Sequence, residues 1–300
     1  MKKKSVYCII VTYNAEKWIY NCIKSIREDN ILLKILIIDN QSQDNTLSIV
    51  KENFPYVEIV QTGKNLGFGK ANNLGYSIAL KNNADYVYLL NQDTISYPDN
   101  IYNLILSGNK INDKVGVVSP LHLNDNGDKL DFLFEKSITS TTCKDYISDI
   151  TLKNTKDFYK ISFVNAAAWL INVDTIKDLG GLFSEAFFHY GEDLNFGSRL
   201  KYFGYSFYII PSIMIHHCRE ERKGKKSKSF ENKEVSINKI TIMHDISGSF
   251  RNQYKQMLKY SFSELSKGNL TNFLDILIYP IFNYSKISNF RDSYINKQLK

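Results

Sequence analysis

The chain lacks the cysteine pairs of a zinc site and the long apolar runs of a membrane span. Its four cysteines are widely spaced and form no C-x-x-C pair, which disfavours a zinc knuckle and favours reduced thiols in a cytoplasmic protein. No apolar run approaches the roughly 20 residues of a membrane span. The nearest run, 273–282, carries Asp275 and Pro280. The short apolar run 6–11 ends too early for a signal peptide and is predicted to be a strand.

Proline is scarce, with five residues, and the positive charge is not spread evenly. The net charge of +7 is concentrated in Lys2–Lys4 and in the run 219–228, and such local patches suit anionic partners. The basic run lacks interleaved aromatic residues, so nucleic-acid binding is not expected. With 300 residues and 43% hydrophobic content, the chain is long and apolar enough for a substantial globular core.

The first half of the chain alternates apolar runs with amphipathic segments. The predicted strands are 6–11, 35–38, 57–60, 86–90 and 115–118, and the predicted helices are 16–28, 45–53, 69–81 and 99–105. This alternation predicts an α/β fold with a mostly parallel central sheet and helices on both faces. Sheets of this kind bind ligands beyond the carboxyl ends of their strands.

The second half is less regular. A first domain is predicted over 1–218, with an insertion at about 120–160 that is rich in polar residues and is expected to hold one or two hairpins. A mobile basic loop is predicted at 219–232, and a C-terminal helical extension at 233–300. The aromatic and basic side chains of this extension suit either packing on the core or contact with a membrane surface.

Three of the predicted strands end in polar residues. They are Thr12, Tyr13 and Asn14 after the first strand, Asp39 after the second, and Asn91, Gln92 and Asp93 after the fourth. Asp39 can accept hydrogen bonds from a ribose or a base, although it can equally cap the next helix. The turn that ends in Asp93 offers oxygen ligands to Mg²⁺ or Mn²⁺, with an ordinary turn as the alternative.

A glycine-rich segment, 63–75, follows the third predicted strand and opens a helix. Gly67 and Gly69 begin a G-x-G-x-x-G pattern, but Asn72 takes the place of the third glycine and the segment does not follow the first strand. A nicotinamide-binding site is therefore rejected. Lys70 near a helix N-terminus suits an anion or a sugar, and a tight turn before a packed helix is the alternative.

Two adjacent histidines, His216 and His217, close the last predicted strand, 213–215. Neighbouring side chains on a strand point to opposite faces, so at most one of the two is expected at the site, as a metal ligand or a phosphate contact. A purely structural histidine is the alternative. The adjoining basic run is either a solvated loop or a segment that closes over a diphosphate.

Two adjacent carboxylates, Glu192 and Asp193, open a predicted helix over 192–203. Helical spacing places Asp193 on a stripe with Phe196 and Glu192 on a stripe with Arg199, so Asp193 is expected to point inward and Glu192 outward. Desolvation would raise the pKa of Asp193 and make it a proton acceptor. Helix capping is the alternative for both.

Together, these segments resemble the family 2 glycosyltransferases with a GT-A fold, over about residues 5–218. The matching segments are Val11-Thr12-Tyr13-Asn14, Ile38-Asp39-Asn40-Gln41-Ser42 with Asp44, Asn65-Leu66-Gly67-Phe68 through Asn72-Asn73-Leu74-Gly75, Leu90-Asn91-Gln92-Asp93, Gly180-Gly181-Leu182-Phe183 and Gly191-Glu192-Asp193. The Leu-Asn-x-Asp and Phe-Phe-x-Tyr-Gly-Glu-Asp patterns look most like the rhamnosyltransferase-like subgroup of bacterial polysaccharide assembly.

The resemblance implies an inverting transfer from a nucleotide-diphosphate sugar, with dTDP-rhamnose or a UDP-hexose as candidate donors. The implied acceptor is a saccharide or a lipid-linked saccharide, which places the protein in the cytoplasm or at the inner face of the membrane. The residues implied to bind the nucleotide sugar are Thr12, Tyr13, Asn14, Asp39, Asn65, Gly67, Lys70, Asn72, Asn91 and Gln92. Asp193 is implied as the catalytic base, with Glu192 in a supporting role.

A divalent cation, Mg²⁺ or Mn²⁺, is implied on Asp93 and on His216 or His217. Asn91 stands where the family's first acidic ligand is usual, which predicts either weak metal binding or a reaction that dispenses with the metal. It also leaves open a catalytically inactive sugar-nucleotide-binding or scaffold protein of an assembly complex. A nucleotidyltransferase is disfavoured because the first strand is not followed by a loop rich in glycine and arginine.

Overall fold

The computed structural model describes residues 3–219 and 228–295, and the chain divides into two compact units. The sheet unit comprises Met1–Leu182 and Gly204–Glu220, and the helical unit comprises Phe183–Phe203 and Glu221–Lys300. Residues 183–203, which the sequence placed in the first domain, therefore group with the C-terminal helices. Most of the predicted basic loop, residues 220–227, lies outside the described residues.

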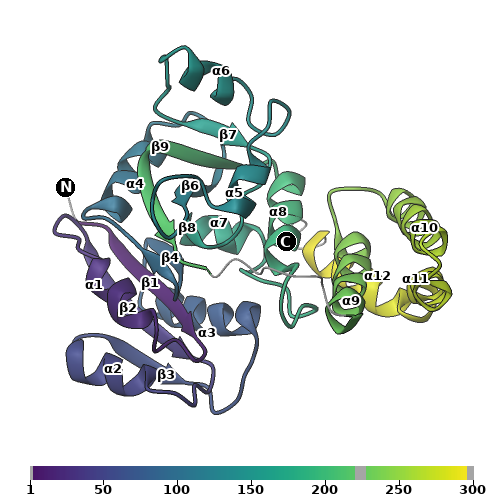
Figure 1. Cartoon of the computed structure of the whole chain (residues 1–300), viewed down its shortest axis with the longest axis horizontal. Helices are drawn as coiled ribbons and strands as arrows, with labels where there is room; N and C mark the ends of the chain where they lie inside the picture. Colours follow the sequence, from purple (N-terminus) through teal and green to yellow (C-terminus); the bar gives the residue numbers. More distant parts are fainter. Residues whose placement is uncertain (1–2, 220–227, 296–300) are drawn as a thin grey trace. The chain divides into compact units, whose positions relative to one another are not determined.

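Within the described residues, nine strands form one sheet in the order β3-β2-β1-β4-β8-β6-β9-β5, and β7 also pairs with β9 (Figure 1). The strands are β1 (Ser5–Thr12), β2 (Leu32–Asp39), β3 (Glu58–Gln61), β4 (Tyr86–Asn91), β5 (Thr94–Ile95), β6 (Val115–Leu123), β7 (Tyr159–Ile161), β8 (Ala168–Asn172) and β9 (Ser206–His217). The pairings among β3, β2, β1 and β4 are parallel, as predicted. The strands β8, β5 and β7 run antiparallel to their neighbours, which the apolar pattern did not indicate.

Helices cover both faces of the parallel strands. The helices of the sheet unit are α1 (Ile19–Ser25), α2 (Thr46–Asn53), α3 (Phe68–Lys81), α4 (Asn100–Asn109), α5 (Phe132–Ser137), α6 (Tyr146–Thr151) and α7 (Val173–Asp178). Ile10 of β1 belongs to the core that contains Ile23 of α1 and Leu104 of α4. Ile9 points to the other face, where a Cβ on Gly75 of α3 would lie 2.6 Å from its Cγ2 atom. Glycine at this position therefore lets α3 approach the sheet closely.

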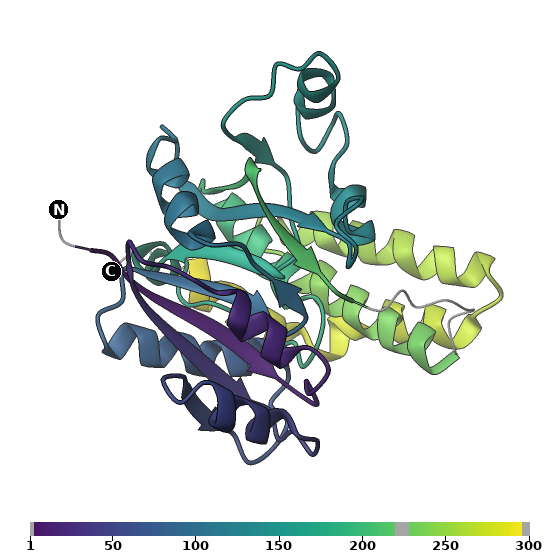
Figure 2. The same ribbon diagram turned by 60° about the vertical axis from the view of Figure 1, so that its left-hand side comes forward.

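The polar insertion at 120–160 contains two short helices, α5 and α6, in place of the expected hairpins. One isolated bridge, between Leu123 and Leu130, is its hairpin-like feature. Asp131 starts α5 by accepting the backbone N–H groups of Leu133 and Phe134, each at 3.0 Å. The fully buried Phe134 anchors this helix to the core, whereas α6 lies beyond β7 at the edge of the unit (Figure 2).

The helical unit contains α8 (Glu192–Tyr202), α9 (Lys228–His244), α10 (Phe250–Ser266), α11 (Leu270–Phe282) and α12 (Tyr284–Ile295). Its apolar core is formed by Val235, Met243, Met257, Ile276 and Ile287. The Asn195 amide of α8 donates to the carbonyl of His244 at 3.0 Å, which joins α8 to the end of α9. Among the described residues, no helix is long and apolar enough to cross a membrane.

Candidate functional site

The ends of β1, β2 and β4 bring three of the predicted polar segments to one edge of the sheet. Thr12 pairs in register with Asp39, and Val11 pairs with Asn91. Because parallel strands share their direction, the residues that follow these strands lie side by side. The structure therefore gathers the segments that the sequence singled out, and backbone register alone fixes their spacing.

Asp39 is the centre of the first group. Its carboxylate is 1% exposed and accepts the hydroxyl of Thr12 at 2.9 Å and the hydroxyl of Ser42 at 2.6 Å. The backbone N–H of Ser42 donates to the other carboxylate oxygen at 3.1 Å. Asn14 ties the two loops together, because its N–H donates to Ser42 and its side chain accepts the N–H of Gln43. Asp39 is therefore held in one orientation before any ligand binds.

The third loop is fastened to the second by Asn40. Its amide accepts the N–H of Leu66 at 3.1 Å and donates to the carbonyl of Gly67 at 3.2 Å. Asn65 accepts the N–H of Gly67 at 2.8 Å, and Gly67 has a φ of +79°, which glycine adopts without strain. The predicted site residues Asn65 and Gly67 thus shape this loop.

Two further predicted residues lie in the first turns of α3. Asn72 is 1% exposed and donates to the carbonyl of Phe68 at 3.0 Å, one turn earlier in the same helix. Lys70 is half-buried. Asn72 therefore stabilises the first turn of α3 from its buried side. Lys70 is the basic one of these two predicted residues.

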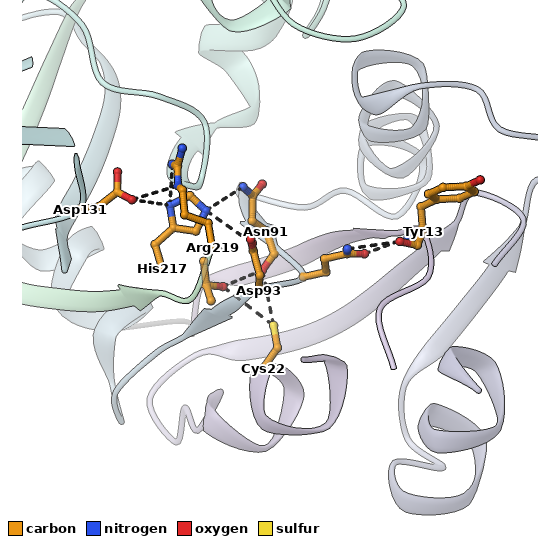
Figure 3. A network of polar contacts seen from close by, with 9 residues as sticks. Tyr13, Cys22, Asn91, Asp93, Asp131, His217 and Arg219 are labelled. Atoms are coloured by element: carbon orange, nitrogen blue, oxygen red, sulfur yellow. Dashed lines mark hydrogen bonds and ion pairs between the residues drawn. The ribbon is translucent and has the colours of Figure 1, made fainter. Parts of the chain in front are cut away.

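The turn after β4 connects the first loop to the end of the sheet. Gln92 accepts the N–H of Tyr13 at 2.8 Å, and its amide donates to the Tyr13 carbonyl at 3.4 Å. Tyr13 itself is 48% exposed. Cys22 lies behind the turn, with its Sγ atom 3.6 Å from the carbonyl of Asn91 (Figure 3). Burial raises the pKa of Cys22 to about 12, so its thiol stays protonated and can donate.

The two histidines at the end of β9 have different surroundings. Nε2 of His217 lies 3.4 Å from Oδ1 of Asp93 and 3.3 Å from the side-chain amide of Asn91 (Figure 3). His216 makes its contacts elsewhere, with Nε2 2.6 Å from the Tyr97 hydroxyl and Nδ1 3.0 Å from the carbonyl of Asp125. The alternation expected along a strand therefore separates the pair, and His217 is the one beside Asp93.

Two charged residues that were not predicted from the sequence complete the surroundings of His217. Arg219 places Nη2 2.8 Å from Nδ1 of the imidazole and pairs with Asp131 through Nε at 2.9 Å. Oδ2 of Asp131 lies 3.7 Å from the same Nδ1 atom (Figure 3). One signal for Asp131 was present in the sequence, because it is an acid flanked by Leu130 and Phe132 within a polar segment.

The charge of Asp93 depends on these neighbours. Burial acts to raise its pKa, but the hydrogen bond and the electrostatic interaction with His217, with a smaller contribution from Arg219, outweigh burial, so the pKa of Asp93 lies below its ordinary value. Asp93 is therefore ionised at neutral pH. This leaves a carboxylate and an imidazole side by side, with a second carboxylate, Asp131, behind the imidazole.

Asp93 and His217 fit a divalent cation. Neighbouring ligands of an octahedral Mg²⁺ at ~2.1 Å are roughly 3 Å apart, and 3.4 Å separates the carboxylate oxygen from the imidazole nitrogen. In the described part of the chain, no group of three or more His, Cys, Asp and Glu side chains forms a metal site. Two protein ligands suit a cation that takes its remaining ligands from phosphate and water.

The carboxylate pair of α8 belongs to the helical unit and differs from the prediction. Glu192 is 5% exposed, and Asp193 is half-buried, so the buried member is the one that was expected to point outward. Both predicted stripes of α8 are covered, because Phe196 and Leu200 are buried as well as Asn195 and Arg199. Asn195 binds α9 and Arg199 stacks on Tyr294, so the stripe of Glu192 packs inside the unit from the first turn on. Helical spacing alone could not show that this stripe too would be covered.

Glu192 has an unusual environment for a carboxylate. Burial, with a smaller contribution from the charge of Asp193, raises the pKa of Glu192 to about 7. Its Oε2 atom is buried and has no hydrogen-bond partner within the described part of the chain. The preceding Gly191 has a φ of +94°, and a Cβ there would lie 2.8 Å from the ring of Phe187. The helix start therefore requires glycine.

A family model, Glycosyl transferase family 2, matches residues 7–180 of the chain. The chain belongs to this family. Its relatives include RfbF, a dTDP-rhamnosyl transferase of Shigella flexneri, with 24% identity over 74% of this chain and 71% of RfbF. RfbG, a dTDP-rhamnosyl transferase of the same organism, is 36% identical over 32% of this chain and 35% of RfbG. The glycosyltransferase SunS of Bacillus subtilis is 29% identical, and the matched region spans 22% of SunS.

Solved structures give the fold. Residues 1–349 of S. aureus TarS in complex with UDP-GlcNAc superpose with a TM-score of 0.56 and 14% identity, covering 98% of this chain and 92% of that one. GalNAc-T7 with UDP, GalNAc and Mn²⁺ superposes with a TM-score of 0.61 and 13% identity, covering 95% of this chain and 58% of that one. The family 2 chain therefore has the predicted GT-A fold.

Proposed function

We propose that this family 2 chain is an inverting glycosyltransferase that moves a sugar from a nucleotide-diphosphate donor to a saccharide hydroxyl. The observation that carries the proposal is the pairing of Asp93 with His217 at the edge of the sheet where the Thr12–Asp39 pair also lies. An ionised carboxylate and an imidazole suit a cation on a diphosphate, and a buried, pre-oriented carboxylate suits a nucleoside.

The nucleoside is bound at the first two loops. Asp39 accepts hydrogen bonds from the base or ribose, and Thr12 and Ser42 fix its orientation through the contacts described above. Tyr13, with a half-exposed ring, offers a face for stacking, and Gln92 holds the Tyr13 backbone in place. Asn14 and Asn65 shape the adjoining loops rather than contact the ligand through a free amide.

The diphosphate is bound at the turn that contains Asp93. A divalent cation held by Asp93 and His217 would neutralise charge that develops on the leaving diphosphate. Asn91 contributes an amide next to His217, and a cation with two firm protein ligands is held weakly until the donor supplies phosphate oxygens. Lys70, at the start of α3, adds positive charge and the helix N-terminus adds N–H donors.

The acceptor hydroxyl is deprotonated by a carboxylate of α8. Inverting transfer is a single displacement at the anomeric carbon, so it requires one base on the acceptor side and no covalent nucleophile. Asp193 is the proposed base, as the family resemblance implies. Glu192, with its buried carboxyl group and a pKa raised to about 7, orients the helix start or the acceptor.

The relatives suggest the donor. RfbF and RfbG are dTDP-rhamnosyl transferases, whereas TarS was solved with UDP-GlcNAc, so dTDP-rhamnose is the first candidate and a UDP-hexose the second. The acceptor we propose is a growing bacterial surface polysaccharide or its lipid-linked precursor.

The test is release of nucleotide diphosphate from a panel of nucleotide sugars, with Mg²⁺ or Mn²⁺ and lipid-linked saccharide acceptors. We expect release from dTDP-rhamnose or a UDP-hexose that requires both acceptor and Asp93. Donor binding, measured by thermal shift, distinguishes the enzyme from a catalytically inactive sugar-nucleotide-binding or scaffold protein. A protein that binds donor tightly but never transfers with any acceptor would be the inactive scaffold.

The helical unit also presents an apolar face that we propose rests on an anionic membrane surface. Five large apolar side chains of α11 are between 42% and 80% exposed, namely Leu270, Leu274, Ile278, Ile281 and Phe282. The helix has 13 residues, fewer than the roughly 20 of a span. On the neighbouring α10, Arg251, Lys255 and Lys259 are exposed, while its one acid, Glu264, is buried and paired with Lys267. Exposed basic side chains in the same unit as an exposed apolar helix face suit anionic lipid headgroups.

Vesicle flotation tests this surface. We expect binding to phosphatidylglycerol vesicles, weaker binding to phosphatidylcholine vesicles, and loss of binding in a Leu274→Gln, Ile281→Gln double variant, whose side chains are exposed. Thr271→Gln, on the same exposed side, is the matched control and should bind as wild type does. Unchanged flotation of the double variant, or a concentration-dependent dimer that the double variant dissociates, would show that lipid is not the occupant.

A further inference from the structure

The loop that precedes α8 exposes two aromatic rings. Phe188 is 62% exposed and Tyr190 is 41% exposed, and Leu194 in the first turn of the helix is 45% exposed. Phe187, by contrast, is buried and packs against His244, with ring centroids 6.2 Å apart. Phe187 therefore anchors the loop, while its neighbours face water. Large exposed apolar side chains that gather in one short segment, unlike a single one, mark an interaction site.

The backbone of this loop is held in place before any ligand binds. Tyr190 has a φ of +71°, a left-handed conformation that residues other than glycine rarely adopt and that persists only where the surroundings hold it. The backbone N–H of Tyr190 donates to the carboxyl group of Glu192, and the ring centroids of His189 and Tyr190 are 4.0 Å apart. Because these contacts already order the Tyr190 ring, a ligand that stacks on it pays little further conformational entropy.

The charges around the two rings disfavour an anionic partner. Residues 183–198 contain the acids Glu185, Glu192 and Asp193 and no lysine or arginine. A phosphate or carboxylate bound here would meet charge of its own sign, which costs affinity. The C–H face of a pyranose, in contrast, can pack on an aromatic face, and its hydroxyl groups can donate to carboxylates. The loop therefore suits an uncharged sugar.

We propose that Phe188 and Tyr190 form the stacking surface for the acceptor, and that the acceptor sugar held there is a neutral pyranose and not an acidic or phosphorylated one. The proposal rests on the proposed function, and it narrows the acceptor class of the same site. Tyr190 is three residues before Asp193, and three residues span at most about 11 Å. One bound saccharide can therefore contact the Tyr190 ring and present a hydroxyl to the proposed base.

Substitutions that keep or remove a ring distinguish a sugar from a lipid chain. Phe188→Leu retains an apolar surface but loses the flat ring face, so it should weaken sugar binding and spare contact with a lipid chain. Tyr190→Phe keeps the ring and should bind sugar as wild type does. Tyr190→Asn removes the ring, and asparagine tolerates the positive φ. Tyr56→Ala is the matched control, because Tyr56 is 69% exposed and belongs to the sheet unit.

The test measures sugar binding without transfer, by saturation-transfer difference NMR. The probes are neutral methyl hexosides and 6-deoxyhexosides and, for each, the methyl uronide of the same configuration. We expect at least one neutral glycoside to bind, with a Kd that Phe188→Leu and Tyr190→Asn each raise roughly 3- to 10-fold, the range of one aromatic contact. The matched uronide should bind more weakly, and this difference should shrink as the salt concentration rises from about 0.05 to about 0.5 M.

Each result bears on one claim. Failure of every neutral glycoside to bind, or equal affinity in wild type and both ring-loss variants, would refute the stacking surface. A uronide that bound as tightly as its neutral counterpart would refute the neutral acceptor. If Phe188→Ser lost flotation with phosphatidylglycerol vesicles at unchanged glycoside affinity, lipid would be the occupant of this loop.

The proposed function is judged separately, by nucleotide diphosphate release. Where transfer occurs, Phe188→Leu should raise the acceptor KM roughly 3- to 10-fold and leave the donor KM unchanged. Transfer with an unchanged acceptor KM in both ring-loss variants would overturn the stacking surface and leave the transferase intact. Glycoside binding that depends on the two rings, without transfer from any donor, would retain the sugar site and remove the transferase.

Discussion

Two acidic groups in this chain are withdrawn from water, Glu192 almost fully and Asp93 with a side chain that is 20% exposed, yet their environments shift their pKa values in opposite directions. Asp93 lies beside His217 and Arg219, and its pKa is held below the ordinary value despite burial. Glu192, in the helical unit, has another carboxylate as its charged neighbour, and its pKa rises to about 7. Burial acts in the same direction on both. The comparison teaches that the neighbouring charge decides whether a buried carboxyl serves as an ionised cation ligand or as a group that exchanges protons near neutral pH.

The largest effect on catalysis is expected from the carboxylate pair of the helical unit. Asp193→Asn should lower kcat by about 1,000-fold, since removing a general base costs typically 10²- to 10⁴-fold. Glu192→Gln, its matched neighbour, should lower kcat by about tenfold or less. Single-turnover rates with saturating donor and acceptor measure both. A severe loss in Glu192→Gln with a mild one in Asp193→Asn would move the base to Glu192.

The buried carboxyl of Glu192 should also be visible in stability. Its folded-state pKa of about 7 exceeds the ordinary 4.5, so between these values the folded protein keeps a proton that the unfolded chain has lost. Stability is therefore full below about pH 4.5 and falls as the pH rises to about 7, by up to roughly 3 kcal/mol. Urea unfolding from pH 5 to 8 should show a fall that Glu192→Gln removes. Parallel curves for the two proteins would mean that Glu192 is ionised in the folded state.

Asp93→Asn tests the ionised member of the comparison. Without the Asp93 carboxylate, the cation that neutralises the diphosphate would be held less firmly. The substitution should therefore reduce kcat/KM by about 100-fold, which corresponds to about 3 kcal/mol of transition-state stabilisation. Asp39→Asn is the control at the same edge of the sheet, and it should raise the donor KM while leaving Mn²⁺ affinity unchanged. If Asp93→Asn kept its Mn²⁺ affinity, the cation would lie elsewhere.

The smallest effects are expected from alanine substitutions that test why a glycine precedes α8. Gly191 and Gly204 both have positive φ, +94° and +78°, but a Cβ would clash with Phe187 at the first and meet nothing within 4 Å at the second. Gly204→Ala should lower the free energy of unfolding by about 1 kcal/mol through backbone strain. Gly191→Ala should cost about 1 to 3 kcal/mol more because of overpacking. Equal losses in thermal or urea unfolding would show that Phe187 moves aside.

Several site residues were predictable because local rules fix them. The parallel strands end in Thr12, Asp39 and Asn91, and strand register alone brings these residues together. Alternation along β9 also predicted that only one of its two terminal histidines would reach the site. Asp131 was missed because its contacts with His217 and Arg219 are distant in sequence, and Arg219 was missed because a basic run has no period from which to place one of its members.

The sequence by itself determined the alternation of strands and helices, the polar residues at the strand ends and the start of α8, because these depend on periodicity, propensity and turn chemistry within a few residues. Tertiary structure alone decided the antiparallel neighbours β8, β5 and β7, the joining of residues 183–203 to the C-terminal helices, and the burial of Glu192 in place of Asp193. Both stripes of α8 carry buried residues, and only the surfaces that pack against the helix determine which of its first two side chains leaves water. The same holds for charge, since the pKa values of Asp93 and Glu192 follow from the side chains that the fold places beside them.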